Sequence, residues 1–440
     1  MSELTIDFEW IDPLAARGAE LRATWARLFM AVDNYPLTRV FDQRSKTMRD
    51  AVYLPLYPFA EWLVERWWSL WTEPGLSSSS DRPGYDTRHS LAHAREGYAL
   101  PPVRIEPAGS IVLVSWYPEK LPSQRLEFPG QGMAWIETNT LKDRLSFLIE
   151  AIVTRLENNE ITDSRLQEEW AAIRAADADE RAFCECAGAL GLDPYDLDDT
   201  QREEIEKVGN LLPEEIVAEF FRSARSEMGD FNADAEEVRV AVENAERNMM
   251  ELRPLTSLAR LVGTWGSSSG GAHWEQGYSF AQRLRAHFGL NGKPLKTMED
   301  IENVLGIGKN DLDNALGKFS NRSIPFAALV GINHKHSPAF ILRPALPASA
   351  RFHFCRALFE YLYAPMKRSS LITDANTDQQ KRNRAFAAEL LAPAAALRDR
   401  IRSPVVTWEK AEELAEEFGV SAYVIGHQLE NHRIAGIQQE

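Results

Sequence analysis

His89 and His93 are a pair of histidines whose spacing could place both side chains on one helix face. They stand at i and i+4, and Glu96 follows one turn later. Imidazole and carboxylate side chains arranged in this way can bind a transition metal. However, Gly84 and Gly97 flank the segment and no fourth ligand accompanies it. The sequence therefore favours a solvated helix over a metal site.

Three further histidines, His334, His336 and His353, are candidate metal ligands in the last third of the chain. The first two fall on a predicted hairpin turn and the third in a predicted helix. No residue spacing requires them to converge, so turn and surface positions are the simpler interpretation. The three cysteines also lack the second pair that a structural zinc site needs.

The same third of the chain has a recognisable order of predicted elements. Phe326–Ile332 and Ala339–Leu342 are apolar stretches that predict a hairpin. Residues 351–363, with the sequence RFHFCRALFEYLY, predict an amphipathic helix. Residues 382–393, RNRAFAAELLAP, predict another helix that ends at its proline.

This order resembles the ImmA/IrrE family of zinc metallopeptidases over residues 277–434. In that family a strand pair precedes a helix with His-Glu-x-x-His, and a second helix reads approximately Glu-Ala-Asn-x-Phe-Ala-Ala-Glu-Leu-Leu-x-Pro. Arg351 and Phe352 match the usual opening of the first helix, and residues 386–393 match the second pattern. The resemblance implies a minimal zincin-like fold, with a zinc held by two histidines and a third ligand and a glutamate as general base.

The family's pattern places different residues at these positions of this chain. Arg356 and Glu360 stand at the two histidine positions, Ala357 at the general base and Arg382 at the third ligand. Arginine offers only hydrogen-bond donors, and alanine cannot accept a proton. The resemblance therefore implies a pseudopeptidase with no catalytic residue, no metal and no cofactor.

The resemblance also makes two structural predictions. The side chains that replace the ligands, Arg356, Glu360 and Arg382, should still face one another, as a carboxylate between two guanidinium groups. Three solvated charges that never meet, or paired arginines that bind an anion, remain alternatives. The two helices should pack within one unit and bury five apolar side chains, which are Phe352, Leu358, Leu362, Phe386 and Leu390.

Residues 407–430 have the pattern of a helix-turn-helix. Gly419 stands at the turn, and Ser421 is placed to cap the second helix. DNA readers insert the second helix into the major groove. The first helix here carries five glutamates, which would repel phosphate. Packing or partner binding is therefore favoured over DNA binding.

The preceding sequence predicts two further regions. In residues 1–155, Asp12 can begin a helix that continues through Trp25 and Leu28, and a second helix is expected at 59–71. Strands are expected at 104–105, 110–116 and within 124–136. We predict an α+β domain at 1–138, an acidic helical domain at 139–262, a Gly/Ser linker at 263–276 and the pseudopeptidase domain at 277–440. The fold class is α+β, mostly helical.

Composition narrows the class of protein. The chain of 440 residues has a net charge of −16 and is 44% hydrophobic, as expected of a multidomain globular protein. Leu156 to Met250 hold 26 acidic and 9 basic residues, so this segment accounts for the excess charge. This balance argues against a general nucleic-acid binder. No apolar run is long enough to span a membrane, which predicts a cytoplasmic protein.

Three functions remain open at this point. The leading hypothesis is an inactive ImmA/IrrE-like protein that binds a protein partner, and the resemblance implies regulation of stress, mobile elements or phage defence. A metal-dependent hydrolase with non-standard ligands is the alternative from the enzyme class. A DNA-binding regulator is the third.

Overall fold

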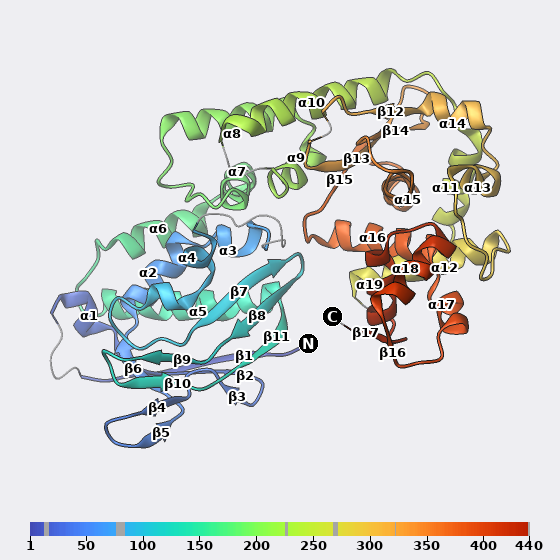
Figure 1. The fold of residues 1–440 in the computed structure, drawn as a ribbon. Helices are drawn as coiled ribbons and strands as arrows, with labels where there is room; N and C mark the ends of the chain where they lie inside the picture. Colours follow the sequence, from blue (N-terminus) through green and yellow to red (C-terminus); the bar gives the residue numbers. More distant parts are fainter. Residues whose placement is uncertain (13–16, 76–83, 225–227, 267–271, 322, 439–440) are drawn as a thin grey trace. The chain divides into compact units, whose positions relative to one another are not determined.

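The computed structural model describes residues 1–12, 17–75, 84–224, 228–266, 272–321 and 323–438. The chain divides into two compact units, Met1–Glu206 and Lys207–Glu440 (Figure 1). It is 50% helix and 18% strand, with several small sheets. The predicted α+β, mostly helical class is confirmed. Two predicted loops, 75–84 and 263–271, fall largely outside the described residues.

The first unit contains three small antiparallel sheets, whose strand orders are β1-β2-β3 with β6 beside β2, β5-β4-β10-β9, and β11-β8-β7. The strands are β1 (Leu4–Trp10), β2 (Trp25–Val32), β3 (Tyr35–Pro36), β4 (Val40–Asp42), β5 (Thr47–Arg49), β6 (Val52–Pro55), β7 (Val103–Ala108), β8 (Ile111–Trp116), β9 (Glu119–Leu121), β10 (Leu126–Phe128) and β11 (Gly132–Glu137). Strands were predicted in the regions of β7, β8, β10 and β11, and these predictions are confirmed.

The helices of the first unit follow the apolar periodicity of the sequence. Helix α5 (Thr138–Glu157) buries a stripe at helical spacing against the sheets. A capping box at Ser164 begins α6, and Asp177 caps α7. The remaining helices are α1 (Ala19–Ala23), α2 (Tyr57–Glu65), α3 (Ser69–Thr72), α4 (Tyr85–His89), the 3-10 helix η1 (Leu91–Ala94), α6 (Arg165–Ala175), α7 (Ala178–Ala189) and α8 (Asp199–Leu211), which crosses into the second unit.

The predicted helix through Trp25 and Leu28 is wrong, because this segment is strand β2. Ala26, Leu28 and Met30 are buried and alternate with more exposed residues, which is the period of a strand. Strand β2 pairs with both β1 and β6, and this pairing outweighs the approximate helical spacing of its apolar residues. The helix predicted at 59–71 is present as two shorter helices, α2 and α3.

The second unit is built around a four-stranded sheet of order β12-β14-β13-β15. The predicted hairpin is confirmed as β13 (Phe326–Ile332) paired antiparallel with β14 (Pro338–Leu342). Strand β15 (Ser369–Thr373) pairs antiparallel with β13, and β12 (Leu316–Lys318) runs parallel to β14. Strands β13, β14 and β15 are buried almost throughout, so the sheet lies inside the unit.

Helices surround this sheet and complete the core of the second unit. Thr297 caps α13, and Gly306 ends it in the left-handed conformation. The helices are α9 (Glu214–Phe221), α10 (Met228–Arg247), α11 (Arg253–Gly263), α12 (His273–His287), α13 (Met298–Leu305), α14 (Lys309–Ala315), α15 (Pro347–Tyr363), α16 (Asp378–Leu391), α17 (Ala394–Arg400), α18 (Trp408–Phe418) and α19 (Ala422–Asn431). Two short strands, β16 (Val405–Val406) and β17 (Gly436–Ile437), pair in parallel.

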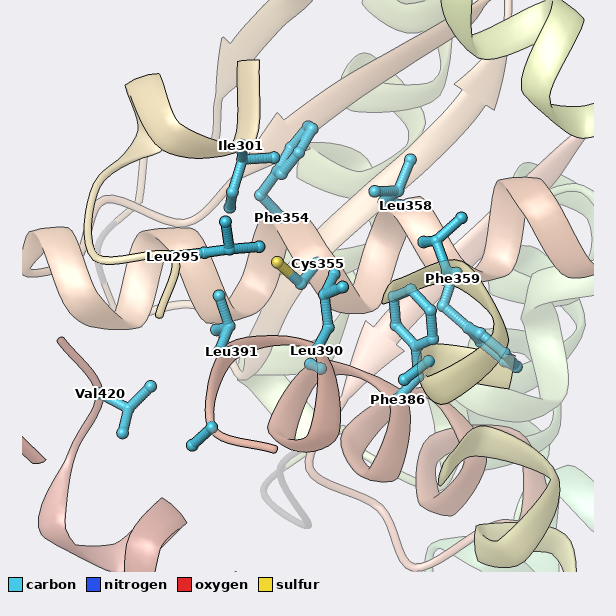
Figure 2. Close-up of a cluster of buried hydrophobic side chains, with 14 of the residues drawn as sticks. Leu295, Ile301, Phe354, Cys355, Leu358, Phe359, Phe386, Leu390, Leu391 and Val420 are labelled. Carbon is cyan, nitrogen blue, oxygen red and sulfur yellow. The ribbon is translucent and has the colours of Figure 1, made fainter. Parts of the chain in front are cut away.

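Helices α15 and α16 pack together in this core, as predicted (Figure 2). Leu358, Leu362, Phe386 and Leu390 are at most 3% exposed, whereas Phe352 is only partly buried. The rings of Phe359 and Phe386 lie 5.0 Å apart between the helices.

A glycine sets the close approach of α12 to α16. A Cβ atom at Gly277 would collide with the carbonyl oxygen of Arg382 and would lie 3.0 Å from the Cβ of Ala385. The two backbones can therefore meet only because position 277 has no side chain.

The division between the units falls inside the predicted acidic domain. Residues 139–206 belong to the first unit, and helix α11 contributes buried residues to the core of the second. The predicted boundaries at 138 and at 263–276 do not coincide with this division. None of the described helices is long and apolar enough to cross a bilayer.

Candidate functional site

Two of the positions that the resemblance assigns to the metal, Arg356 and Glu360, lie on a buried stretch of helix α15, and the third, Arg382, lies on α16. Helix α15 begins after Leu346 with Pro347 at its first position, where the missing N–H costs nothing. Every residue from His353 to Leu362 is buried. A charged side chain on this stretch must find its partners inside the protein.

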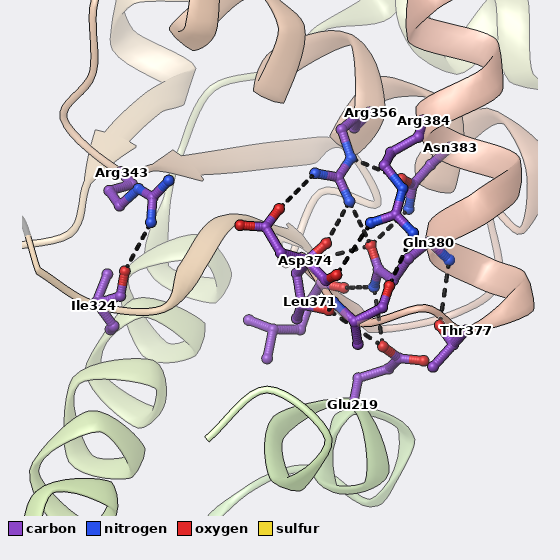
Figure 3. Close-up of polar contacts among 12 residues, drawn as sticks. Glu219, Ile324, Arg343, Arg356, Leu371, Asp374, Thr377, Gln380, Asn383 and Arg384 are labelled. Atoms are coloured by element: carbon purple, nitrogen blue, oxygen red, sulfur yellow. Dashed lines mark hydrogen bonds and ion pairs between the residues drawn. The ribbon is translucent and has the colours of Figure 1, made fainter. Parts of the chain in front are cut away.

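Arg356 finds those partners among carbonyl and amide oxygens. Its Nε donates to Oδ1 of Asn383 at 2.8 Å, and its Nη2 donates to Oε1 of Gln380 at 2.9 Å and to the carbonyl of Thr373 at 2.5 Å (Figure 3). Its Nη1 lies 3.6 Å from Oδ1 of Asp374. Burial lowers the pKa of Arg356 to about 9. The guanidinium thus joins α15 to β15 and α16.

Glu360 stands one turn after Arg356 and connects to it through Asn383. Nδ2 of Asn383 donates to Oε1 of Glu360 at 3.0 Å, while Oδ1 of the same amide accepts from Arg356. Burial raises the pKa of Glu360 to about 7, against the effects of the Asn383 hydrogen bond and of the positive charges on Lys367 and Arg382. An amide can bridge the two groups because it has both a donor and an acceptor.

Gln380 is the centre of this polar cluster. Its Oε1 accepts from Arg356, from Nδ2 of Asn383 at 3.0 Å and from the backbone N–H of Thr373 at 3.1 Å. Its Nε2 donates to the carbonyl of Leu371 at 2.8 Å and to Oε2 of Glu219 at 3.1 Å. We call Arg356, Glu360, Gln380, Asn383 and Glu219 the buried polar network. It links α9, β15, α15 and α16 (Figure 3).

Arg382 does not take part in the predicted triad. Its Nη1 lies 3.1 Å from Nδ1 of His273, and its guanidinium lies over the ring of Tyr363 at 5.0 Å. Among the described residues, no ion pair within 4.0 Å joins Glu360 to Arg356 or to Arg382. The charges that were predicted to face one another thus make no direct ion pair among the described residues, and Asn383, for which no role was predicted, bridges Arg356 and Glu360 instead.

The residues at the degenerate motif do not fit a zinc ion. Nε and Nη2 of Arg356 are already donating, and Ala357 is fully buried without a polar atom. Glu360 alone could supply a ligand oxygen, and a tetrahedral site needs more. Throughout the described ranges, no cluster of three or more His, Cys, Asp or Glu side chains could hold a metal.

His89 and His93 do not share a helix face. Helix α4 ends at His89, Ser90 is extended, and the exposed His93 lies in η1. Nδ1 of His89 lies 2.7 Å from the Ile105 carbonyl, and Nε2 lies 3.1 Å from the carboxylate of Glu73. Both ring nitrogens of His89 thus lie against oxygen atoms of the protein itself, Ile105 on one side and Glu73 on the other.

The buried carboxylate of Glu73, in the first unit, contacts both His89 and Arg88. Arg88 donates to both of its carboxylate oxygens, at 2.6 and 2.5 Å. Burial opposes ionisation of Glu73, but the hydrogen bonds from Arg88 and His89 outweigh it and hold the pKa below its usual value. Of the metal ligands considered in the sequence, His89 is thus part of a polar cross-link between helix and sheet, whereas His93 is exposed.

The other candidate histidines are also dispersed. His334 and His336 are exposed in the turn between β13 and β14. His353 is buried on α15, and burial together with the charges of Arg356 and Arg343 lowers its pKa to about 4. His353 is therefore neutral at pH 7.

Glu389, a buried residue of the second helix pattern, links several helices through its carboxylate. Glu389 accepts from the backbone N–H of Ala394 at 3.1 Å, from Gln428 at 2.9 Å and from Gln282 at 3.1 Å. It therefore joins α16 to α12, α17 and α19. The predicted helix-turn-helix is confirmed as α18 and α19, with Gly419 in the left-handed conformation and Ser421 capping α19.

The sequence contained one weak signal for the overlooked residues. Gln380 and Asn383 are three apart and precede the apolar run of α16, so they share the helix face that packs on α15. Glu219 is far away in the sequence, and only the tertiary fold brings it to Gln380.

Comparison with family models, curated proteins and solved structures found no match for this chain. The resemblance to the ImmA/IrrE family therefore rests on the motif residues and their order.

Proposed function

We propose that this protein is a catalytically inactive ImmA/IrrE-like pseudopeptidase that acts by binding a protein partner. The observation that supports this most is the hydrogen-bonded chain Arg356–Asn383–Glu360, whose two ends occupy the positions where the resemblance expects the two histidine ligands. A buried guanidinium with amide partners can stabilise helix packing but cannot activate water. The role is regulatory, in stress response, mobile-element control or phage defence.

The first experiment measures metal and activity. The purified full chain, exposed to zinc and then desalted, should hold far less than one zinc per chain by mass spectrometry of metals. Unfolding should be unchanged by EDTA, and a casein substrate should not be cleaved. Stoichiometric zinc combined with EDTA-sensitive cleavage would contradict the proposal.

A second experiment tests the resemblance itself. A variant with Arg356→His, Ala357→Glu, Glu360→His and Arg382→Glu restores the family's ligand set on α15 and α16. It should bind zinc and be stabilised by it, because binding to the folded state alone raises the free energy of unfolding. The matched control retains Arg382 and should bind zinc more weakly. If neither the full variant nor the control, both folded by circular dichroism, responds to zinc, the two helices do not form a zincin-like site.

A further inference from the structure

A cavity of about 500 Å³ lies in the second unit between α18, α19 and β17. Gly419 turns the chain sharply between the two helices, and β17 pairs with β16 beside them. Gly426 lines the cavity on α19, where a Cβ atom would lie 2.9 Å from the side chain of Ile437. The absence of a side chain at Gly426 leaves room on the α19 side.

Two aromatic rings line this cavity. Trp408 is the first residue of α18 and Tyr423 the second residue of α19, and their ring centroids lie 5.3 Å apart in an edge-on arrangement. Tyr423 is 70% exposed, which is high for a large aromatic side chain. Exposed aromatic faces beside a cavity are typical of binding surfaces.

Carboxylates surround the same rings. Glu409 and Glu412 of α18 and Glu430 of α19 line the cavity and are exposed. The one lysine of α18, Lys410, pairs instead with Glu413 at 2.7 Å. In the part of the chain that the structure describes, neither Glu412 nor Glu430 forms an ion pair. Their charges are available to a ligand.

We propose that this aromatic and acidic pocket, defined by Trp408, Glu412, Tyr423 and Glu430, binds an arginine side chain from a basic segment of a partner protein. The inference rests on the proposed function and names the surface used. Arginine fits because its planar guanidinium stacks on aromatic rings while its N–H groups pair with carboxylates. The phosphates of a nucleic acid would be repelled by the same carboxylates.

The test uses the full chain and a fluorescent peptide of alternating glycine and arginine. Binding is followed by anisotropy at about 0.15 M salt, where long-range attraction to the acidic chain is screened. A peptide with citrulline in place of arginine keeps the shape without the charge. The arginine peptide should bind at least about ten times more tightly, a difference of about 1.4 kcal/mol.

Variants locate the site. Glu412→Gln and Tyr423→Ala should each weaken binding about two- to fivefold, the range for exposed ion pairs and cation–π contacts. Glu416→Gln is the matched control, since it removes the same charge from an exposed position of α18 outside the cavity. It should leave the affinity within experimental error. The side chains of Glu412, Tyr423 and Glu416 are all exposed, so the three variants should unfold like the parent protein.

Three outcomes would overturn the pocket assignment: equal losses for Glu412→Gln and Glu416→Gln, no loss for Tyr423→Ala, or tighter binding of a duplex DNA than of the arginine peptide. The zinc and cleavage measurements are independent of these. A protein that lacks zinc but ignores the peptide refutes the pocket alone, and a zinc-bound active protein refutes the proposed function.

Discussion

Arg356 and Glu360 lie one helical turn apart and are both hydrogen-bonded to the same side chain, Asn383. The ion pair that their spacing suggests is therefore replaced by an amide bridge from the neighbouring helix. Each group keeps a partner while buried, which is the condition for tolerating charge in a protein interior.

Replacing Arg356 should destabilise the second unit strongly. Arg356→Ala removes the donor to Oδ1 of Asn383 and one donor each from Gln380 and the Thr373 carbonyl. The loss should be about 3–5 kcal/mol, as for a broken buried charge network. The free energy of unfolding in urea measures it. Arg402→Ala, at an exposed position, should change stability by less than about 0.5 kcal/mol. Similar effects of the two variants would mean that the network contributes little.

The amide bridge predicts coupling between Arg356 and Asn383. Asn383→Leu should cost about 2–4 kcal/mol, because Arg356 and Glu360 both lose a hydrogen-bond partner in a buried site. When Asn383→Leu is combined with Arg356→Met, the total loss should be smaller than the sum by about 1–3 kcal/mol. A double-mutant cycle in urea gives this difference. Additive losses would contradict the bridge.

Glu360 predicts a specific dependence of stability on pH. Burial raises its folded pKa from 4.5 to about 7, so the native protein binds the proton more tightly than the unfolded chain. The contribution of Glu360 to the free energy of unfolding is therefore fully present below about pH 4.5 and is lost as the pH rises through 7. Glutamine does not ionise, so Glu360→Gln should prevent this loss of stability. Its amide oxygen can still accept the hydrogen bond from Asn383.

The measurement is the difference in unfolding free energy between Glu360→Gln and the parent chain at each pH. The variant should gain about 1–3 kcal/mol on going from pH 5 to pH 8. Taking the difference cancels the opposite slope of His353, whose lowered pKa makes stability rise with pH. A difference that does not change with pH would show that Glu360 ionises as in the unfolded chain.

Because the space around Gly277 and Gly209 differs, alanine should change the stability in opposite directions at the two positions. Gly277→Ala should destabilise by about 1–3 kcal/mol, because the new methyl group collides with the Arg382 carbonyl and pushes α12 from α16. Gly209→Ala, in α8 with open space around it, should stabilise by about 0.5–1 kcal/mol. Thermal unfolding compares the two, and a shared sign would refute the close approach.

Local patterns in the sequence predicted much of the second unit. The hairpin, the α15–α16 pair and the α18–α19 turn were all predicted, because each is specified by apolar period, turn residues or capping residues. Strand β15 was missed since its five residues, SSLIT, are buried throughout and show no alternation. Strand β2 was mistaken for a helix because its apolar residues also fall at roughly helical spacing, and the pairing with β1 and β6 that decides its structure is not visible in the local pattern.

The site was less predictable. Arg356 and Glu360, which the resemblance places at the motif positions, lie one helical turn apart in the buried polar network, but their hydrogen-bond partners were not predicted. Asn383 and Gln380 carry no charge, so a search for ionic partners overlooks them, and Glu219 reaches Gln380 only through the tertiary fold. The orientation of Arg382 toward His273 and Tyr363 depends on α12, whose approach is set by Gly277.

The packing role of Glu389 bears on what the sequence segment around it can indicate. It lies in the segment that carries the resemblance, Phe386 to Pro393, and its carboxylate receives hydrogen bonds from three other helices or their first residues. The neighbouring Phe386, Leu390 and Leu391 are core residues. This segment therefore records how the helices assemble and not whether the protein cleaves a peptide bond. A chain can therefore carry this segment for its packing alone, whatever its activity.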